Sequence, residues 1–165
     1  MFGAIEEGKA LANETLKRNF GYVNYCPKCL YRCISDEPLT KCEFCGKKLL
    51  SVGYVWTGKM EDEDVIRKMQ NLLLKVDWLN TSSQINNLLE FLKTEDKVPL
   101  YYDIHKVCKV YSISVPKFER IIEKLKAAGY IAVRTHFCET GIKTNAKLKT
   151  LLEALECTKT LNKFL

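Results

Sequence analysis

Four cysteines form two Cys-x-x-Cys pairs, and their spacing constrains the fold more than any other feature of the chain. Cys26 and Cys29 make the first pair, Cys42 and Cys45 make the second, and twelve residues separate the pairs. Each pair can direct two thiolates at one ion, and a hairpin that joins the pairs completes the tetrahedral shell of a structural Zn²⁺ site. The pattern therefore predicts a zinc ribbon, in which Gly46 takes the positive φ that such a turn often needs.

The same cysteines have other interpretations. Two disulfides or four unrelated thiols would also fit the count, and Cys33 could replace one ligand, although we expect it to lie outside the site. Eight cysteines suit metal ligands and buried thiols in a reducing compartment better than a disulfide framework. We therefore expect a cytoplasmic protein in which Cys108, Cys138 and Cys157 are small core residues.

Length and charge limit the class of protein. The 165 residues, 47% of them hydrophobic, suffice for one ordinary domain or two small ones. No stretch approaches the roughly 18 uninterrupted apolar residues of a membrane span, so we expect no membrane partner. Residues 1–84 carry 12 basic and 11 acidic side chains, and residues 85–165 carry 14 and 9, so +5 of the net charge of +6 lies in the second half. This excess is compatible with binding to nucleic acid, and also with an ordinary solvated surface.

Hydrophobic periodicity predicts an α+β fold, a zinc ribbon followed by a mostly helical winged-helix-like domain. The predicted parts are a junction helix within residues 1–20, the ribbon at 21–58, a connecting helix at 59–84 and the winged-helix-like domain at 85–165. The acidic residues 61–64 suit the start of the connecting helix better than a metal site, because they point in different directions. Its apolar face is expected to reach Leu79.

The order of elements in the last part predicts the winged helix. Helix periodicity, caps and strand patterns follow one another in the order helix, helix, helix, hairpin. The expected elements are helices at 85–92, 103–111 and 116–128, strands at 130–137 and 142–144, and a helix at 145–157.

Basic side chains gather on two of these elements. Lys117, Arg120 and Lys124 recur at i, i+3 and i+7 on the helix at 116–128, opposite its apolar stripe. Winged helices often meet nucleic acid there, and the alternative is a solvated helix in which Glu119 and Glu123 pair locally. Further basic residues in and after the predicted hairpin could extend the surface along a phosphate backbone. These are Arg134, His136, Lys143 and Lys147.

No set of catalytic residues emerges. His105 fits a partly buried position on a helix, and His136 has neither a nucleophile nor a third triad member near it in the sequence. We predict no catalytic residue in this chain.

Five stretches together resemble the C-terminal region of tRNA guanosine-26 N2-dimethyltransferases, chiefly of the archaeal kind. They occur in the same order as in that family and span nearly the whole chain. The stretches are GKALANETLK at 8–17, YCPKCLYR at 25–32, YYDIHK at 101–106, RTHF at 134–137 and GIKTNA at 141–146.

The resemblance implies a two-part enzyme of which only the second part is present. In such enzymes an N-terminal Rossmann-like domain binds S-adenosylmethionine and methylates a guanine of tRNA. Neither an Asp-Pro-Phe-Gly run nor a glycine-rich cofactor turn occurs in this sequence. The expected chain is a catalytically silent C-terminal part that binds tRNA and works with a catalytic domain in cis or in trans.

The resemblance also bears on individual residues. Arg134, His136, Lys143 and Thr144 match the family's motif and would approach RNA or the domain interface. The motif could equally stabilise the turn of the wing.

Two other functions are compatible with the sequence. A free-standing DNA-binding regulator would combine the ribbon and the winged helix at a promoter, but the helix at 116–128 has no Asn or Gln for adenine edges and only Arg120 for guanine. A protein-interaction module would bind a partner through the ribbon and through the connecting helix at 59–84, which begins with the acidic residues 61–64.

Overall fold

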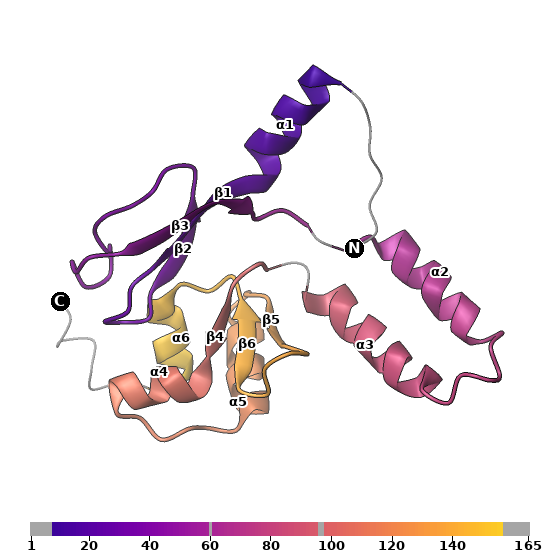
Figure 1. Ribbon diagram of the computed structural model, residues 1–165. Coiled ribbons are helices and arrows are strands. Elements are labelled where there is room, and N and C mark those ends of the chain that lie inside the picture. Colours follow the sequence, from indigo (N-terminus) through magenta and orange to yellow (C-terminus); the bar gives the residue numbers. More distant parts are fainter. Residues whose placement is uncertain (1–7, 60, 96–97, 157–165) are drawn as a thin grey trace. The chain divides into compact units, whose positions relative to one another are not determined.

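The computed structural model describes residues 8–59, 61–95 and 98–156, and the chain divides into two units, Met1–Gly58 and Lys59–Leu165. Six helices and two small antiparallel sheets make up the described residues (Figure 1). The fold is therefore mixed α and β, as the sequence predicts. In the described part of the chain, no helix has the length and apolar character needed to cross a membrane.

The first unit is a three-stranded sheet preceded by a helix. Helix α1 (Lys9–Asn19) leads into β1 (Phe20–Tyr25), which lies between β2 (Arg32–Ser35) and β3 (Leu50–Trp56). No residue of α1 is buried, in accord with its weak apolar pattern. Residues 4–7 of the predicted junction helix lie outside the described residues.

A buried asparagine organises the loop beside this sheet. Asn24, on β1, is fully buried and donates to Ser35 Oγ at 2.8 Å. Its Oδ1 accepts from the backbone N–H of Leu39 at 2.9 Å and also from the Ser51 hydroxyl. A buried amide must satisfy its donors and acceptors, so these bonds fix the loop before Cys42 against β1 and β3.

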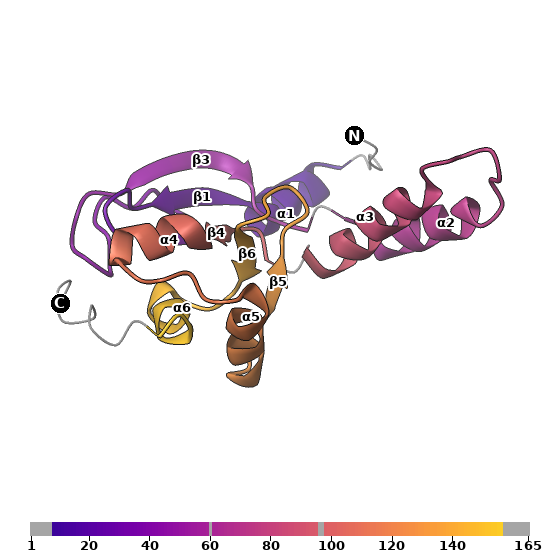
Figure 2. The same cartoon turned by 90° about the horizontal axis from the view of Figure 1, so that it is seen from below.

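The second unit begins with two paired helices, α2 (Glu63–Leu73) and α3 (Ser82–Glu95), which lie side by side in both views (Figure 1, Figure 2). The Asp62 side chain caps α2 by accepting from the backbone N–H groups of Asp64 and Val65. The predicted extension of α2 to Leu79 is wrong, because the helix ends at Leu73 and a turn follows, with Lys75 N–H donating to Leu72 C=O. Only Ile66 of α2 is buried, so little packing favours further helical turns.

The rest of the second unit packs three helices with a second sheet. Strands β4 (Tyr101–Asp103), β6 (Gly141–Thr144) and β5 (Ala132–Arg134) pair in that order. The helices are α4 (Ile104–Tyr111), α5 (Phe118–Ala127) and α6 (Leu148–Ala154). The sequence predicts these helices and both hairpin strands, although the predicted strand at 130–137 and helix at 145–157 are longer than observed, and residue 157 lies outside the described residues. Strand β4 is missing from the prediction.

The register of this sheet separates its two faces. Tyr102, Ile142 and Arg134 are paired across the strands and share one face, whereas Tyr101, Lys143 and Val133 share the other. The first face contributes Tyr102 and Ile142 to the apolar core. Helices α4 to α6 supply further large core residues, among them Ile104, Val107, Ile121, Leu125, Leu148, Leu151 and Leu152.

Candidate metal centre and nucleic-acid interface

The two cysteine pairs form turns with the same backbone bonds. In the first turn Leu30 N–H donates to Cys26 C=O at 2.8 Å, and in the second Gly46 N–H donates to Cys42 C=O at 2.8 Å. Cys26 N–H and Cys42 N–H each donate to the carbonyl five residues ahead, at 2.8 and 2.7 Å. Leu30 and Gly46 both have positive φ, 63° and 70°. The predicted conformation of Gly46 is confirmed, and Leu30 is its unpredicted equivalent.

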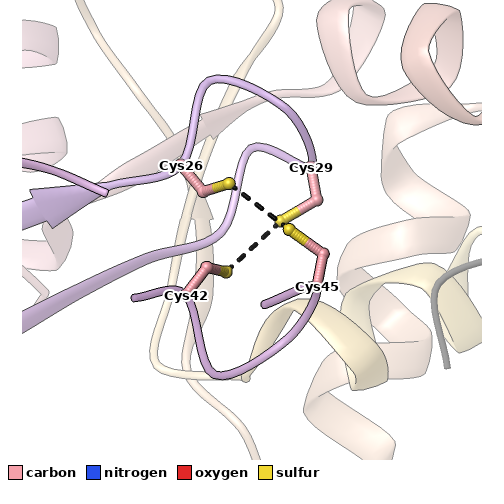
Figure 3. A group of neighbouring side chains, drawn as sticks. All are labelled: Cys26, Cys29, Cys42 and Cys45. Atoms are coloured by element: carbon pink, nitrogen blue, oxygen red, sulfur yellow. Dashed lines mark hydrogen bonds between the residues drawn. The ribbon is translucent and has the colours of Figure 1, made fainter. Parts of the chain in front are cut away.

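These turns bring the four sulfur atoms together (Figure 3). The four Sγ atoms all lie within 4.8 Å of one another, with 3.5 Å between Cys26 and Cys45 and 3.6 Å between Cys29 and Cys42. A tetrahedral site with zinc–sulfur bonds of about 2.3 Å has sulfur–sulfur edges of about 3.8 Å. The cluster therefore has the size and the donor set of a four-thiolate zinc site. Cys33 lies on β2 and is not in the cluster.

Burial makes the cluster a poor place for uncompensated thiolates. Burial raises the pKa of the Cys29 thiol and that of the Cys42 thiol. It acts in the same direction on Cys26, but the backbone N–H groups of Cys29 and Lys28 donate to that sulfur and bring its pKa below the ordinary value. Three buried thiolates and the half-buried one of Cys45 therefore need a cation to balance their charge.

Three predicted basic residues lie along α5. Lys117 precedes the helix and is exposed, as is Arg120, whose side chain is 62% exposed. Lys124 is half-buried. Arg120 and Lys124 both contact Glu156 Oε1, at 2.6 and 2.7 Å. The hydrogen bond from Lys124, and then the charge of Arg120, lower the pKa of Glu156.

Arg134 also lies beside α5. Its guanidinium carbon is 4.6 Å from the centre of the Phe118 ring, and Nη1 is 3.7 Å from Glu119 Oε1. Phe118 lies 6.1 Å from the ring of His105, which is exposed rather than partly buried as the sequence suggests. Arg134 is therefore held at the surface by a cation–π contact and a weak ion pair.

The remaining motif residues do not share one surface. Lys143 and Thr144 are each 5% exposed, so the structure places both in the interior. The Lys143 ammonium lies 3.3 Å from the buried Glu95 carboxylate, and Thr144 Oγ1 accepts from the backbone N–H of Ala146. Their positions favour the alternative in which the motif stabilises the hairpin.

His136 lies at the boundary between interior and surface. Its side chain is 35% exposed, and its Nδ1 lies 3.1 Å from Glu95 Oε1. Lys147 precedes α6 and is exposed. Of the predicted basic residues, Lys117, Arg120, Arg134 and Lys147 are exposed and remain candidates for a nucleic-acid interface, and His136 is partly exposed.

Comparisons with known proteins agree on one family. The family model described as N2,N2-dimethylguanosine tRNA methyltransferase matches residues 1–156. The tRNA (guanine(26)-N(2))-dimethyltransferase of Methanobrevibacter smithii is 38% identical over 157 residues, which cover 92% of this chain and 40% of that relative. The enzyme of the same description from Methanocorpusculum labreanum is 36% identical over 152 residues, which cover 90% and 40%.

A solved structure resembles the fold as well. The complex of Trm1 from Pyrococcus horikoshii with S-adenosyl-L-methionine matches with a TM-score of 0.75 and 31% identity, over 90% of this chain and 38% of that one. The chain thus spans about 40% of the length of the curated relatives it matches.

Proposed function

The chain belongs to the N2,N2-dimethylguanosine tRNA methyltransferase family, and we propose that it is a C-terminal part that binds tRNA for a methyltransferase. Methyl transfer from S-adenosylmethionine then belongs to the portion of the relatives that this sequence does not span, in cis or in trans. This chain alone is inactive in that reaction. The family match over residues 1–156 carries the proposal.

The division of labour follows from the chemistry of the substrate. The amine of a guanine in folded RNA is hidden while the base is paired or stacked, so the enzyme must select the RNA by shape and charge and expose the base. Exposed cations supply affinity for the phosphate backbone without reading sequence. On this proposal Lys117, Arg120 and Lys147 contact phosphates, and Lys124, Arg134 and His136 lie at the edge of that contact.

The finer architecture is part of the same proposal. Residues 21–58 form a zinc ribbon, in which Cys26, Cys29, Cys42 and Cys45 hold one Zn²⁺ as a structural ion. Residues 85–165 form a winged-helix-like domain, in which α5 is the helix nearest the RNA and β5–β6 is the wing. The ion has no open coordination position in such a site and supplies rigidity, not chemistry.

Binding to a tRNA transcript tests the function. The variant Lys117→Ala/Arg120→Ala/Lys147→Ala should bind more weakly, and the slope of log affinity against log salt should become shallower by about 2 to 3, because three phosphate contacts are lost. The matched control, Lys59→Ala/Lys68→Ala/Lys75→Ala, removes the same charge from exposed positions in and beside α2. Equal losses in the two variants would remove the proposed interface.

Duplex DNA of equal charge provides the second comparison. The proposal requires the chain to prefer tRNA, whereas a DNA-binding regulator would prefer the duplex. A chain that binds neither would leave protein interaction as the function. Metal analysis should find one zinc per chain, and a purified chain in which residues 21–58 fold without zinc would contradict the structural site.

A further inference from the structure

A buried carboxylate holds two residues of the β5–β6 hairpin. Glu95, the last residue of α3, is 1% exposed. Its Oε1 accepts from the backbone N–H of His136 and lies 3.1 Å from His136 Nδ1. Its Oε2 lies 3.3 Å from Lys143 Nζ, and that ammonium also donates to the Glu95 carbonyl at 3.4 Å. The sequence pattern gives no sign of this arrangement, because Glu95 lies 41 residues from His136.

The arrangement determines which nitrogen of His136 carries a proton. The Lys143 ammonium balances the charge of Glu95, and an ionised carboxylate has no proton to donate, so Nδ1 is the donor in the contact with Glu95. A neutral imidazole in this tautomer has a lone pair on Nε2. The partly exposed ring therefore offers an outside partner a hydrogen-bond acceptor.

An exposed aromatic ring lies beside this acceptor. Phe137 is 54% exposed. Its ring meets the His136 ring edge to face at 5.2 Å and the Tyr101 ring edge to face at 5.0 Å, and Lys143 Nζ lies 5.9 Å from its centre. The neighbours hold Phe137 in place although more than half of it faces solvent. A fixed, exposed ring is a surface on which a nucleobase can stack.

We propose that His136 and Phe137 receive one unpaired ribonucleotide of the bound RNA. Phe137 stacks on the base, and His136 Nε2 accepts a hydrogen bond from the 2′-hydroxyl of the ribose. Glu95 is a positioning residue that sets the tautomer of His136, and Lys143 balances its charge. The 2′-hydroxyl is the group that distinguishes RNA from DNA at a given site. This inference rests on the proposed RNA-binding function.

The tautomer can be tested without RNA. In the full chain, nitrogen NMR above the pH range in which imidazole titrates should find the His136 proton on Nδ1. Glu95→Gln alone would leave Lys143 buried without its carboxylate, so the informative variant is Glu95→Gln/Lys143→Met, which removes both charges together. The carboxamide introduced at position 95 can pair with either tautomer of His136, so the preference of the imidazole proton for Nδ1 should fall. A proton on Nε2 in the wild-type chain would overturn the proposal.

The sugar preference gives the binding test. Single-stranded ribose and deoxyribose oligonucleotides of one sequence, about ten nucleotides long, should differ in affinity by about fivefold in favour of ribose, the effect of one hydrogen bond. His136→Ala should abolish that ratio. Phe137→Leu should weaken both oligonucleotides about tenfold and keep the ratio, because stacking does not depend on the sugar.

The outcomes separate this inference from the function on which it rests. If the wild-type chain binds neither the tRNA transcript nor the oligonucleotides, both the RNA-binding function and the ribonucleotide site fail. If it binds tRNA but His136→Ala leaves the ratio of ribose to deoxyribose affinity unchanged, only the ribonucleotide site fails.

Discussion

Among the described residues, cysteine is the commonest buried side chain of the first unit, whereas leucine and isoleucine are the commonest of the second. In the described part of Met1–Gly58, three cysteines of the sulfur cluster are buried together with Leu30, Tyr31, Leu49 and Asn24. The first unit also leaves large apolar side chains of β3 exposed, with Val52 at 63% and Leu50 at 53%. In the second unit Ile104, Ile121, Leu125 and Leu148 are fully buried.

We infer that the two units are stabilised by different interactions. The first unit, Met1–Gly58, is in the size range in which an apolar core alone supplies little stability and a metal ion often adds to it, whereas the second, Lys59–Leu165, is larger. On the proposed function, the sulfur cluster holds such an ion in the first unit, and we expect the larger apolar core of the second unit to need none. The comparison therefore predicts that each unit can be destabilised without the other.

Removing zinc should give the largest effect. Metal binding supplies about 10 kcal/mol of folding free energy in small zinc domains, so a chelator or Cys42→Ser should unfold the first unit. The amide NMR signals of β1 to β3 should lose their chemical-shift dispersion, while those of α4 to α6 keep theirs. Cys33→Ser, which changes a thiol outside the cluster, is the control and should retain the zinc. Loss of dispersion in both sets of signals would show that the second unit also depends on zinc.

A cavity in the second unit is the reciprocal change. Leu125 on α5 is fully buried, and Leu125→Ala should lower the free energy of unfolding of this unit by about 2–5 kcal/mol. Urea denaturation followed by helical circular dichroism measures this, and zinc content should not change. Leu88→Ala, at a position 41% exposed on α3, is the matched control and should have a much smaller effect. Zinc release by Leu125→Ala would show that the units are coupled.

In the second unit, Asp103 should make the free energy of unfolding depend on pH. Partial burial alone would raise the pKa of Asp103, but the Lys106 N–H and the Thr140 hydroxyl donate to its carboxylate and hold its pKa below the ordinary value. The stability from this group is present above the unfolded pKa, about 3.9, and is lost as pH falls below it. Asp103→Asn should remove that pH dependence at a cost of about 1 kcal/mol, because the α4 cap is weakened. Stability profiles from pH 2 to 7 that have the same shape for the two chains would contradict this role.

The sequence predicts most of this architecture, because local signals determine most of it. The cysteine spacing anticipates the sulfur cluster, and apolar periodicity together with capping residues anticipates the described helices. Boundaries fail where tertiary contacts decide them. Helix α2 stops at Leu73 although the apolar pattern continues to Leu79, and β4 exists only because Tyr101 to Asp103 pair with β6.

The candidate interface is harder to predict, since sequence spacing says nothing about burial. Lys143 has the charge of a phosphate ligand, but the alternation of the strand turns it toward Glu95, far away in the sequence. A glutamate at the end of a helix does not indicate from the sequence that it is buried and paired with a distant lysine, because its partners lie far away in the chain. For the same reason Leu30 escapes prediction: a leucine carries no sign of positive φ, whereas Gly46 does.

The smallest expected effect comes from replacing a glycine that adopts positive φ by alanine, at one position in each unit. Gly46 has φ 70° in the second cysteine turn, and Gly129 has φ 85° after α5. A Cβ at Gly46 would come no closer than 3.7 Å to the Lys41 side chain, and one at Gly129 would meet nothing within 4 Å. Alanine at either site therefore introduces backbone strain and no clash, at a cost of about 1 kcal/mol.

Because the two changes are chemically identical, they isolate the dependence on metal. Gly46→Ala should weaken zinc retention about fivefold in a competition with a chelator, since about 1 kcal/mol of strain is linked to metal binding. Gly129→Ala should leave zinc retention unchanged and lower only the urea midpoint of the second unit. A change in zinc retention by Gly129→Ala would mean that the apolar core, and not the sulfur cluster alone, supports the first unit.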